Sequence, residues 1–520
     1  MRNYKILWAD DEIDLLKPHI LFLNDKGYEV EPVNSGADAL ESLKEDDFDI
    51  VFLDENMPGI SGLETLEQIK PLYPSLPVVM ITKSEEEYIM EEAIGSQIAD
   101  YLIKPINPNQ ILLSVKKILD NKRLVSQKTN MSYQQDFRNI SMAFSENLDH
   151  NEWIEIYKKM VHWELKIDET EEKDMAEILN MQKEEANSEF SEFLIDNYEE
   201  WLNQPDIDRP LLSYQLMSRE VFPLLKSDEK VFFFLIDNLR YDQWQLIEPM
   251  VSEYFHIENE VPFYSILPTT TAYARNAIFS GLMPDDMATR HKDIWVGEDK
   301  EEGKNLQEEE FLRRNMKRCG LEGKSMTYNK VIQKEQGKQV LNNINNLYKN
   351  DLNVVVYNFV DVLSHARTDL KMIRELAPDE SAYRSLTQSW FMHSTLLEML
   401  KILSEKDFKV VITTDHGTIR VNKPVKIVGD KNTNPNLRYK VGKNLNVDNP
   451  ESVYIVRSPE DLRLPKPNVS SAYFFTKKDD FFAYPNNYNH YVNLYKDTFQ
   501  HGGISMEEVI VPLIHLKPKK

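Results

Sequence analysis

The chain has 520 residues, of which 41% are apolar and 28% are charged. This composition is typical of folded globular proteins and excludes wholesale disorder, collagen-like sequence and coiled-coil arrays. The 86 acidic residues outnumber the 61 lysines and arginines, and the net charge of −25 argues against duplex DNA as the main partner. At roughly 150 residues per domain, the length predicts about three domains.

Cysteine content and the lack of long apolar runs indicate the compartment. Cys319 is the only cysteine of the sequence, which excludes an intramolecular disulfide and a thiolate zinc site. The acidic residues Asp10 and Asp11 come too early for a signal peptide. The apolar run Val231–Ile236 is far shorter than the roughly 20 residues that a membrane-spanning helix needs. We therefore expect a cytoplasmic protein without a membrane span.

Residues 1–120 alternate short apolar runs with amphipathic stretches. The runs Lys5–Ala9, Ile50–Leu53 and Val78–Ile81 have the length and composition of buried parallel strands. This alternation predicts an α/β domain with a doubly wound, flavodoxin-like sheet.

Four side chains that suit metal or phosphoryl chemistry follow these predicted strands, and a fifth follows a further apolar run, Tyr101–Ile103. Because the carboxyl ends of parallel strands meet at one edge of a sheet, we expect the five to lie together. Clustered carboxylates bind a hard cation such as Mg²⁺, whereas lysine and threonine suit the oxygens of a phosphoryl group. A carboxylate in such a site can attack a phosphoryl donor. The five are Asp10, Asp11, Asp54, Thr82 and Lys104.

With their neighbours, these residues form ordered motifs: Asp10-Asp11-Glu12, Leu53–Gly62, Ile81-Thr82 and Lys104-Pro105. In order and spacing they resemble the receiver domain of two-component response regulators. The resemblance implies that a sensor histidine kinase leads to phosphorylation of Asp54, and that Thr82 and Lys104 contact the phosphoryl group. It implies Tyr101 as an aromatic switch. The implied Mg²⁺ ligands are Asp10, Asp11, Asp54 and the backbone of Asn56.

Residues 121–225 contain no glycine and almost no strand signal. The stretches 151–163 and 173–202 have the apolar spacing of amphipathic helices. We interpret this segment as a central helical bundle with a solvated acidic face, or as an element that relays a signal.

From residue 226 onward, strand-like runs return, and each is followed at once by an aspartate. In open α/β sheets this edge binds ligands. The runs are Val231–Ile236, Asn353–Val360 and Phe408–Thr414, and the aspartates are Asp237, Asp361 and Asp415.

Three histidines lie in suggestive surroundings: His365 is one helical turn after Asp361, His416 follows Asp415, and His501 precedes two glycines. Mixed carboxylate and imidazole ligands suit Zn²⁺. Seven ligands suit two ions, and two-metal sites clamp the attacking and leaving oxygens of a phosphoryl transfer. The predicted ligands are Asp237, Thr271, Asp361, His365, Asp415, His416 and His501.

Three consecutive threonines, Thr269 to Thr271, precede a predicted helix that ends near Gly281. A helix N-terminus attracts an anion, and a metal-activated hydroxyl there can attack phosphorus. The residues alone leave all three threonines open as the nucleophile.

The ordered set from Asp237 to His501 resembles the alkaline phosphatase superfamily, and within it the PglZ group. The spacing from Thr271 to Gly281 resembles the nucleotide pyrophosphatase/phosphodiesterase branch, which implies Thr271 as the catalytic nucleophile. The resemblance also implies how two Zn²⁺ are divided. One takes Asp237, Thr271, Asp415 and His416, and the other takes Asp361, His365 and His501.

Three further residues are candidates for binding substrate. Arg275 and Asn276 lie on the predicted nucleophile helix, and Arg438 lies near Lys440 in a region of loops and short strands. Surface solvation or helix capping is an equal alternative for each.

The whole chain, with predicted domains 1–120, 121–225 and 226–520, resembles response regulators linked to type IX secretion. This implies homodimerisation on phosphorylation, zinc-dependent hydrolysis of nucleotide-type phosphodiesters, and contacts with a sigma factor and secretion components. Two alternatives remain. The chain is a phosphorylation-gated protein-binding scaffold with vestigial catalysis, or it hydrolyses a monoester or sulfate ester.

Overall fold

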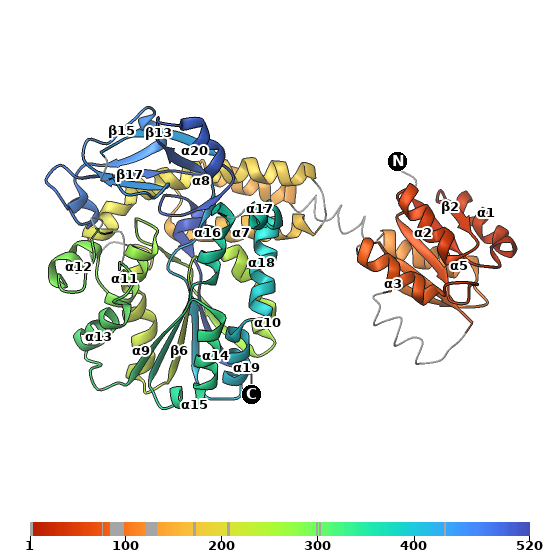
Figure 1. Cartoon of the computed structure of the whole chain (residues 1–520), viewed down its shortest axis with the longest axis horizontal. Helices are drawn as coiled ribbons and strands as arrows, with labels where there is room; N and C mark the ends of the chain where they lie inside the picture. The colour runs from red at the N-terminus through yellow and green to blue at the C-terminus, as the bar shows by residue number, and fades with distance from the viewer. Residues whose placement is uncertain are drawn as a thin grey trace. The chain divides into compact units, whose positions relative to one another are not determined.

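The computed structural model describes residues 4–74, 76–83, 98–120, 133–169, 173–204, 208–297, 300, 303–369, 371–430 and 433–519. The chain forms two compact units, Met1–Gln135 and Asp136–Lys520. Both are drawn in Figure 1, and each is described by itself.

The N-terminal unit is a five-stranded parallel sheet in the order β2-β1-β3-β4-β5. Residues on alternate sides of its strands enter separate hydrophobic clusters: Leu7 and Val51 lie in one, Ile6 and Phe52 in the other. The doubly wound, flavodoxin-like domain predicted from the sequence is thereby confirmed. Its elements are β1 (Lys5–Ala9), α1 (Lys17–Asp25), β2 (Glu29–Val33), α2 (Gly36–Glu45), β3 (Ile50–Asp54), α3 (Gly62–Leu72), β4 (Val78–Thr82), β5 (Asp100–Ile103) and α5 (Pro108–Val115).

The second unit is built around a six-stranded sheet in the order β7-β21-β11-β6-β10-β9. Strands β9, β10, β6 and β11 are parallel, whereas β21 is antiparallel to both of its neighbours. The strands are β6 (Val231–Ile236), β7 (Phe255–Glu260), β9 (Met326–Val331), β10 (Leu352–Tyr357), β11 (Lys409–Thr413) and β21 (Leu513–Pro518).

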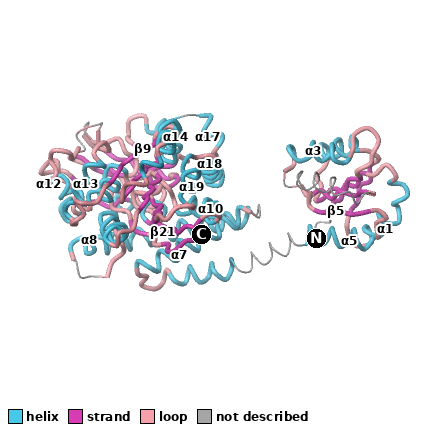
Figure 2. The backbone as a smooth tube through the Cα atoms, turned by 90° about the horizontal axis from the view of Figure 1, so that it is seen from below, coloured by secondary structure: helices cyan, strands magenta, loops and turns pink. Residues whose placement is uncertain are grey.

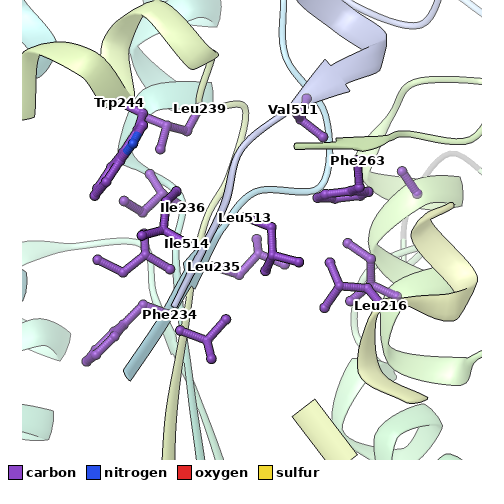
Figure 3. Packing of buried hydrophobic residues seen from close by; sticks show 14 of the residues in the cluster. Leu216, Phe234, Leu235, Ile236, Leu239, Trp244, Phe263, Val511, Leu513 and Ile514 are labelled. Carbon is purple, nitrogen blue, oxygen red and sulfur yellow. The ribbon is translucent and has the colours of Figure 1, made fainter. Parts of the chain in front are cut away.

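Helices cover both faces of this sheet, and its central strand β6 is apolar throughout. Every residue of β6 is buried. In Figure 3, Trp244 packs on the side of Phe234 and Ile236, while Leu216 lies on the side of Leu235. Figure 1 shows α9, α11 and α13 on one side and α10, α18 and α19 on the other. These helices are α9 (Phe222–Lys226), α10 (Tyr241–Ser252), α11 (Asn276–Ser280), α13 (Glu308–Arg318), α18 (Glu380–Met392) and α19 (Thr395–Leu403).

The described part of the middle segment is mainly helical, with α7 (His150–Asp168) and α8 (Lys173–Asn203) (Figure 2). Both helices belong to the second compact unit, Asp136–Lys520. The reason is that their apolar faces join the hydrophobic core of the sheet domain. The rings of Phe190 and Trp201 lie 6.0 and 5.6 Å from the ring of Tyr264, a residue of the sheet domain.

Residues 419–500 form short strands in addition to loops, as the sequence indicated. Two three-stranded sheets are present, β15-β13-β18 and β14-β17-β16. Strand β17 (Ala472–Thr476) is largely buried, so its aromatic residues are core rather than a platform for stacking bases. The other strands are β13 (Lys423–Val428), β14 (Tyr439–Gly442), β15 (Asn446–Val447), β16 (Val453–Val456) and β18 (Asp480–Ala483).

One predicted boundary is wrong. Strand β10 ends at Tyr357, and α16 (Phe359–Asp369) begins before the predicted strand end at Val360. Asp361 therefore lies in the first turn of a helix, which places His365 on the same helix one turn later.

Within the described residues, no helix combines the length and apolarity needed to cross a bilayer.

Candidate phosphorylation and metal sites

The predicted acidic pocket of the first unit is assembled at the carboxyl edge of its sheet. Asp54 and Asp10 are buried, and the Lys104 ammonium lies 2.8 Å from a carboxylate oxygen of each. Burial raises the pKa of the Asp54 carboxyl. Asp10, Asp11 and Asp54 each offer an oxygen within 4.8 Å of the others, and Asp11 is exposed. This set of hard oxygen ligands fits Mg²⁺.

The other predicted receiver residues lie on or directly after strands of the same sheet. Thr82 ends β4, is fully buried, and its hydroxyl donates to the carboxylate of Glu55. Tyr101 is half-buried on β5, and Asn56 is exposed two residues after Asp54.

Gly62 was not singled out by the sequence analysis, yet its position explains the turn after Asp54. A Cβ atom there would lie 2.3 Å from the backbone oxygen of Asp54. Only glycine allows the start of α3 to approach the end of β3 so closely.

The first metal-ligand cluster of the second unit is fully buried. Asp237 follows β6, while Asp415 and His416 follow β11; each offers an atom within 4.8 Å of the others. The Thr271 hydroxyl lies 3.4 Å from Asp237 Oδ1 and 3.2 Å from His416 Nε2. His416 Nδ1 lies 3.0 Å from the Gly417 carbonyl oxygen. Donation there leaves the lone pair of Nε2 directed at the cluster.

Arg275 joins the two carboxylates of this cluster. Its guanidinium pairs with Asp237 and lies 2.9 Å from Asp415 Oδ2. Although burial opposes it, the Arg275 charge lowers the pKa of Asp415 to about 2. Burial raises the pKa of Asp237 to about 7 despite the same arginine. Arg275 is fully buried, so surface solvation is excluded and its donors are directed at protein carboxylates.

The second cluster comprises Asp361, His365 and His501. Asp361 Oδ1 lies 3.5 Å from His365 Nε2 and 3.6 Å from His501 Nε2, and accepts no hydrogen bond within the described chain. His501 Nδ1 lies 3.3 Å from the Thr269 carbonyl oxygen, so its Nε2 retains a lone pair. A buried carboxylate oxygen without a donor, facing two imidazole nitrogens, fits a Zn²⁺ ion.

The two clusters adjoin. The rings of His416 and His501 stack with their centroids 4.3 Å apart. The His365 side chain is 62% exposed, which opens the second cluster to solvent.

The three threonines have different surroundings. The Thr269 hydroxyl donates to the Gly503 carbonyl and accepts from the Gly502 N–H, so it holds the turn after His501. The Thr270 hydroxyl is buried and has no hydrogen-bond partner in the described residues. Of the three, Thr271 is the one whose hydroxyl lies between metal-ligand candidates.

The substrate role suggested for Arg438 is wrong. Its side chain is fully buried and pairs with Glu508, 2.6 Å away, and with the backbone oxygens of Lys477 and Asp480. Glu508 in turn accepts from the Gly503 N–H at 2.9 Å. Arg438 therefore supports the turn that carries His501. The nearby Lys440 is also buried and donates to the Asn434 carbonyl.

Asn276 is buried as well, and its amide donates to the backbone oxygens of Ala272 and Lys304 at 2.8 and 2.9 Å. It fastens the loop at Lys304 to the start of α11. Asn276 is therefore not a solvated surface residue, and it is not part of either metal-ligand cluster.

Several supporting residues were missed by sequence reasoning. Asn358 donates to Asp237 Oδ2 at 2.7 Å. Glu308 lies 3.5 Å from the Arg275 guanidinium. At Gly417 a Cβ atom would lie 1.9 Å from the Glu507 carbonyl oxygen, so the chain requires a glycine there. Asn358 and Glu308 carry no motif that marks them, whereas Gly417 stands beside the predicted ligands Asp415 and His416.

The fold and the sites define a receiver domain joined to a phosphatase-like α/β domain with two adjoining groups of candidate metal ligands. Three family models match the chain: the response regulator receiver domain over residues 6–116, the PorX response regulator linker domain over 123–202, and the BREX system PglZ alkaline phosphatase-like domain over 216–516. The last covers more than half of the chain, which therefore belongs to the PglZ family. The predicted combination of a receiver domain and a PglZ domain is confirmed, the middle segment matches the PorX linker model, and the receiver implies a sensor kinase as partner.

Curated relatives and solved structures match shorter parts of the chain. The transcriptional regulatory protein ZraR of Escherichia coli O157:H7 is 34% identical over 127 residues, 24% of this chain and 29% of that protein. The chain thus spans less than a third of the length of this relative. The CpxR homolog of Haemophilus influenzae is 32% identical over 148 residues, 28% of this chain and 63% of that protein. The chemotaxis protein CheY4 of Vibrio cholerae is 29% identical, covering 23% of this chain and 100% of that chain, with a TM-score of 0.22.

Proposed function

We propose that this chain is a response regulator whose phosphorylation on Asp54 controls a two-zinc phosphodiesterase acting on nucleotide-type phosphodiesters. The observation that carries the proposal is the adjacency of the two ligand clusters, with the Thr271 hydroxyl at 3.2 Å from His416 in the first of them.

In this proposal, one zinc would be held by Asp237, Thr271, Asp415 and His416, and the other by Asp361, His365 and His501. Bound zinc would supply Lewis-acid stabilisation of the charge on the phosphoryl oxygens. Asp237 Oδ1, 3.4 Å away, orients the Thr271 hydroxyl. Thr271 Oγ1 gives up its proton to solvent and forms the new bond to phosphorus as the ester oxygen leaves and takes a proton from water. A second water then cleaves the phosphothreonine and restores the hydroxyl.

The test is hydrolysis of bis(p-nitrophenyl) phosphate by the full chain, compared with p-nitrophenyl phosphate as the monoester. We expect turnover that requires zinc, is lost on chelation, returns when zinc is restored, and favours the diester. A preference for the monoester would move the assignment to a phosphomonoesterase. Absent turnover, with zinc in the protein verified by elemental analysis, would contradict catalysis and favour the binding scaffold.

The regulatory half of the proposal assigns Mg²⁺ to Asp10, Asp11, Asp54 and the backbone of Asn56, with Thr82 and Lys104 on the phosphoryl group. Added negative charge beside Thr82 draws it inward and Tyr101 follows, so that two receivers pair. The sensor histidine kinase supplies the phosphoryl group. A sigma factor and type IX secretion components are the proposed downstream partners.

Asp54→Asn is expected to abolish phosphorylation, because the amide cannot accept the phosphoryl group from a donor. Incubation with acetyl phosphate and Mg²⁺, followed by intact-mass measurement, checks this. Asp14→Asn is the matched control, since Asp14 is exposed and pairs with Lys17 outside the pocket. Sedimentation of the same samples tests whether the homodimer forms only with Asp54 present. A phosphorylated Asp54→Asn protein would place the acceptor elsewhere.

A further inference from the structure

A groove of about 580 Å³ lies beside the start of α7. None of the residues that line it is one of the candidate metal ligands described above. Its walls come from the segment before α7, from the first turn of α7, from the second half of α8, and from Asp208 after α8. We call it the acidic groove, because its rim consists of six exposed carboxylates: Glu146, Asp149, Glu189, Glu192, Asp196 and Asp208.

The floor of the acidic groove is aromatic. The rings of Phe144 and Trp153 stack at 5.9 Å with an interplanar angle of 15°. Phe193 lies 5.9 Å from Trp153 and 5.6 Å from Trp201. Phe144 and Phe193 are half-buried, so part of this floor remains accessible. Such rings attract cations through their π-faces.

One polar atom of the floor lacks a partner. Trp153 is 2% exposed, and its indole N–H donates to no acceptor in the described part of the chain. A buried donor without an acceptor costs free energy.

The rim is electrostatically unbalanced. Glu189, Glu192 and Asp196 follow one another at spacings of three and four residues on α8, where like charges repel. Among the described residues, no lysine or arginine lines the groove. In the described part of the chain, one of the six rim carboxylates has an ion pair: Glu192 pairs at 2.7 Å with Lys477, which is not among the residues that line the groove.

The charge of the groove decides between classes of ligand. Nucleic acids and anionic lipid surfaces are repelled by six carboxylates. The rim carboxylates belong to none of the groups in the described chain that are compact enough to hold a metal ion. Positive charge spread along an extended chain matches spread carboxylates better than a single ion or a small amine does.

We propose that the acidic groove is a docking site for a basic peptide segment of a partner protein, with an arginine or lysine side chain over the rings of Phe144 and Phe193. Neighbouring basic residues of that segment pair with Glu189 and Asp196. The site is separate from hydrolysis and does not depend on the proposed phosphodiesterase activity.

The probe is a fluorescein-labelled peptide of alternating arginine and leucine, titrated with the full chain and followed by fluorescence anisotropy. A peptide of alternating glutamate and leucine has the same apolar residues with the opposite charge and serves as the negative control. The test variant is Glu189→Gln with Asp196→Asn. The matched control is Glu185→Gln with Glu200→Gln, which removes two equally exposed charges of α8 outside the groove.

We expect the test variant to bind the basic peptide roughly tenfold more weakly, and the control to stay within about twofold of the unaltered chain. The glutamate peptide should not bind. Equal weakening in both double variants would reduce the interaction to the general acidity of the chain and overturn the proposal. Unchanged affinity in the test variant would overturn it as well.

Phe144→Ala tests the aromatic floor separately. It should weaken binding while leaving the slope of affinity against salt concentration unaltered, because the ion pairs remain. A thermal unfolding curve verifies that this variant is folded. Sedimentation tests whether a second copy of the chain occupies the groove instead. If the unaltered chain forms a dimer that the Glu189→Gln/Asp196→Asn variant does not form, the occupant is a second copy and the proposal is wrong.

Discussion

Thr271→Ala is expected to lower zinc-dependent turnover of a phosphodiester by at least about a thousandfold. The variant lacks the hydroxyl that lies 3.2 Å from His416 Nε2 and 3.4 Å from Asp237 Oδ1, so no side chain in the first cluster can form the bond to phosphorus. Asp237, Asp415 and His416 remain, and elemental analysis should still find zinc.

Thr270→Ala is the matched control for this experiment. It removes a neighbouring hydroxyl that is buried and has no hydrogen-bond partner in the described chain, and we expect turnover within a few-fold of the original. Loss of turnover in both variants would point to damage of the threonine turn rather than loss of a nucleophile. Full activity of Thr271→Ala with zinc present would show that the attacking group is another one.

Arg275→Met is expected to lower the free energy of unfolding of the metal-free protein by about 3–5 kcal/mol, because it leaves buried carboxylates without their counter-charge. Arg275 is fully buried and pairs with Asp237, Asp415 and Glu308. Urea denaturation measures the change. Added zinc should recover part of the loss, since a cation bound by Asp237 and Asp415 replaces the missing positive charge.

Arg463→Met provides the comparison. Arg463 also pairs with two carboxylates, Asp285 and Asp286, but its side chain is 30% exposed, so water screens the interaction. We expect a loss below about 1 kcal/mol. If Arg275 served the substrate instead, Arg275→Met would raise KM and leave stability unchanged. That result would contradict the positioning role.

The proposed variants test partner binding and catalysis separately. Variants of the acidic groove test docking without touching Thr271 or a metal ligand, and Thr271→Ala tests chemistry without touching the groove. A chain that docks a basic peptide yet hydrolyses nothing would be a phosphorylation-gated scaffold. A chain that does both would couple a receiver to an enzyme and to a partner through the same helical segment.

The sequence by itself determined the class of fold and the identity of the candidate ligands. Short apolar runs that end at Asp54, Asp237 and Asp415 are local patterns. The rule that parallel strands share a carboxyl edge predicts one site at the edge of each of the two sheets, with Asp54 in the first and Asp237 and Asp415 in the second. The spacing of Asp361 and His365 is likewise a property of a single helix. Local periodicity is sufficient for such predictions because the geometry of a single helix or strand fixes the positions of residues that are close in sequence.

Only the tertiary structure showed which residues pair with the buried arginines and with the apolar faces of the middle helices. Arg275 and Arg438 have the same side chain, but one joins two metal-ligand candidates and the other holds the His501 turn through Glu508. The middle helices join the core of the sheet domain because their apolar faces meet residues such as Tyr264, far away in sequence. The partner of a buried charge or an apolar face is set by long-range packing, and a single sequence does not encode that pairing in any short pattern.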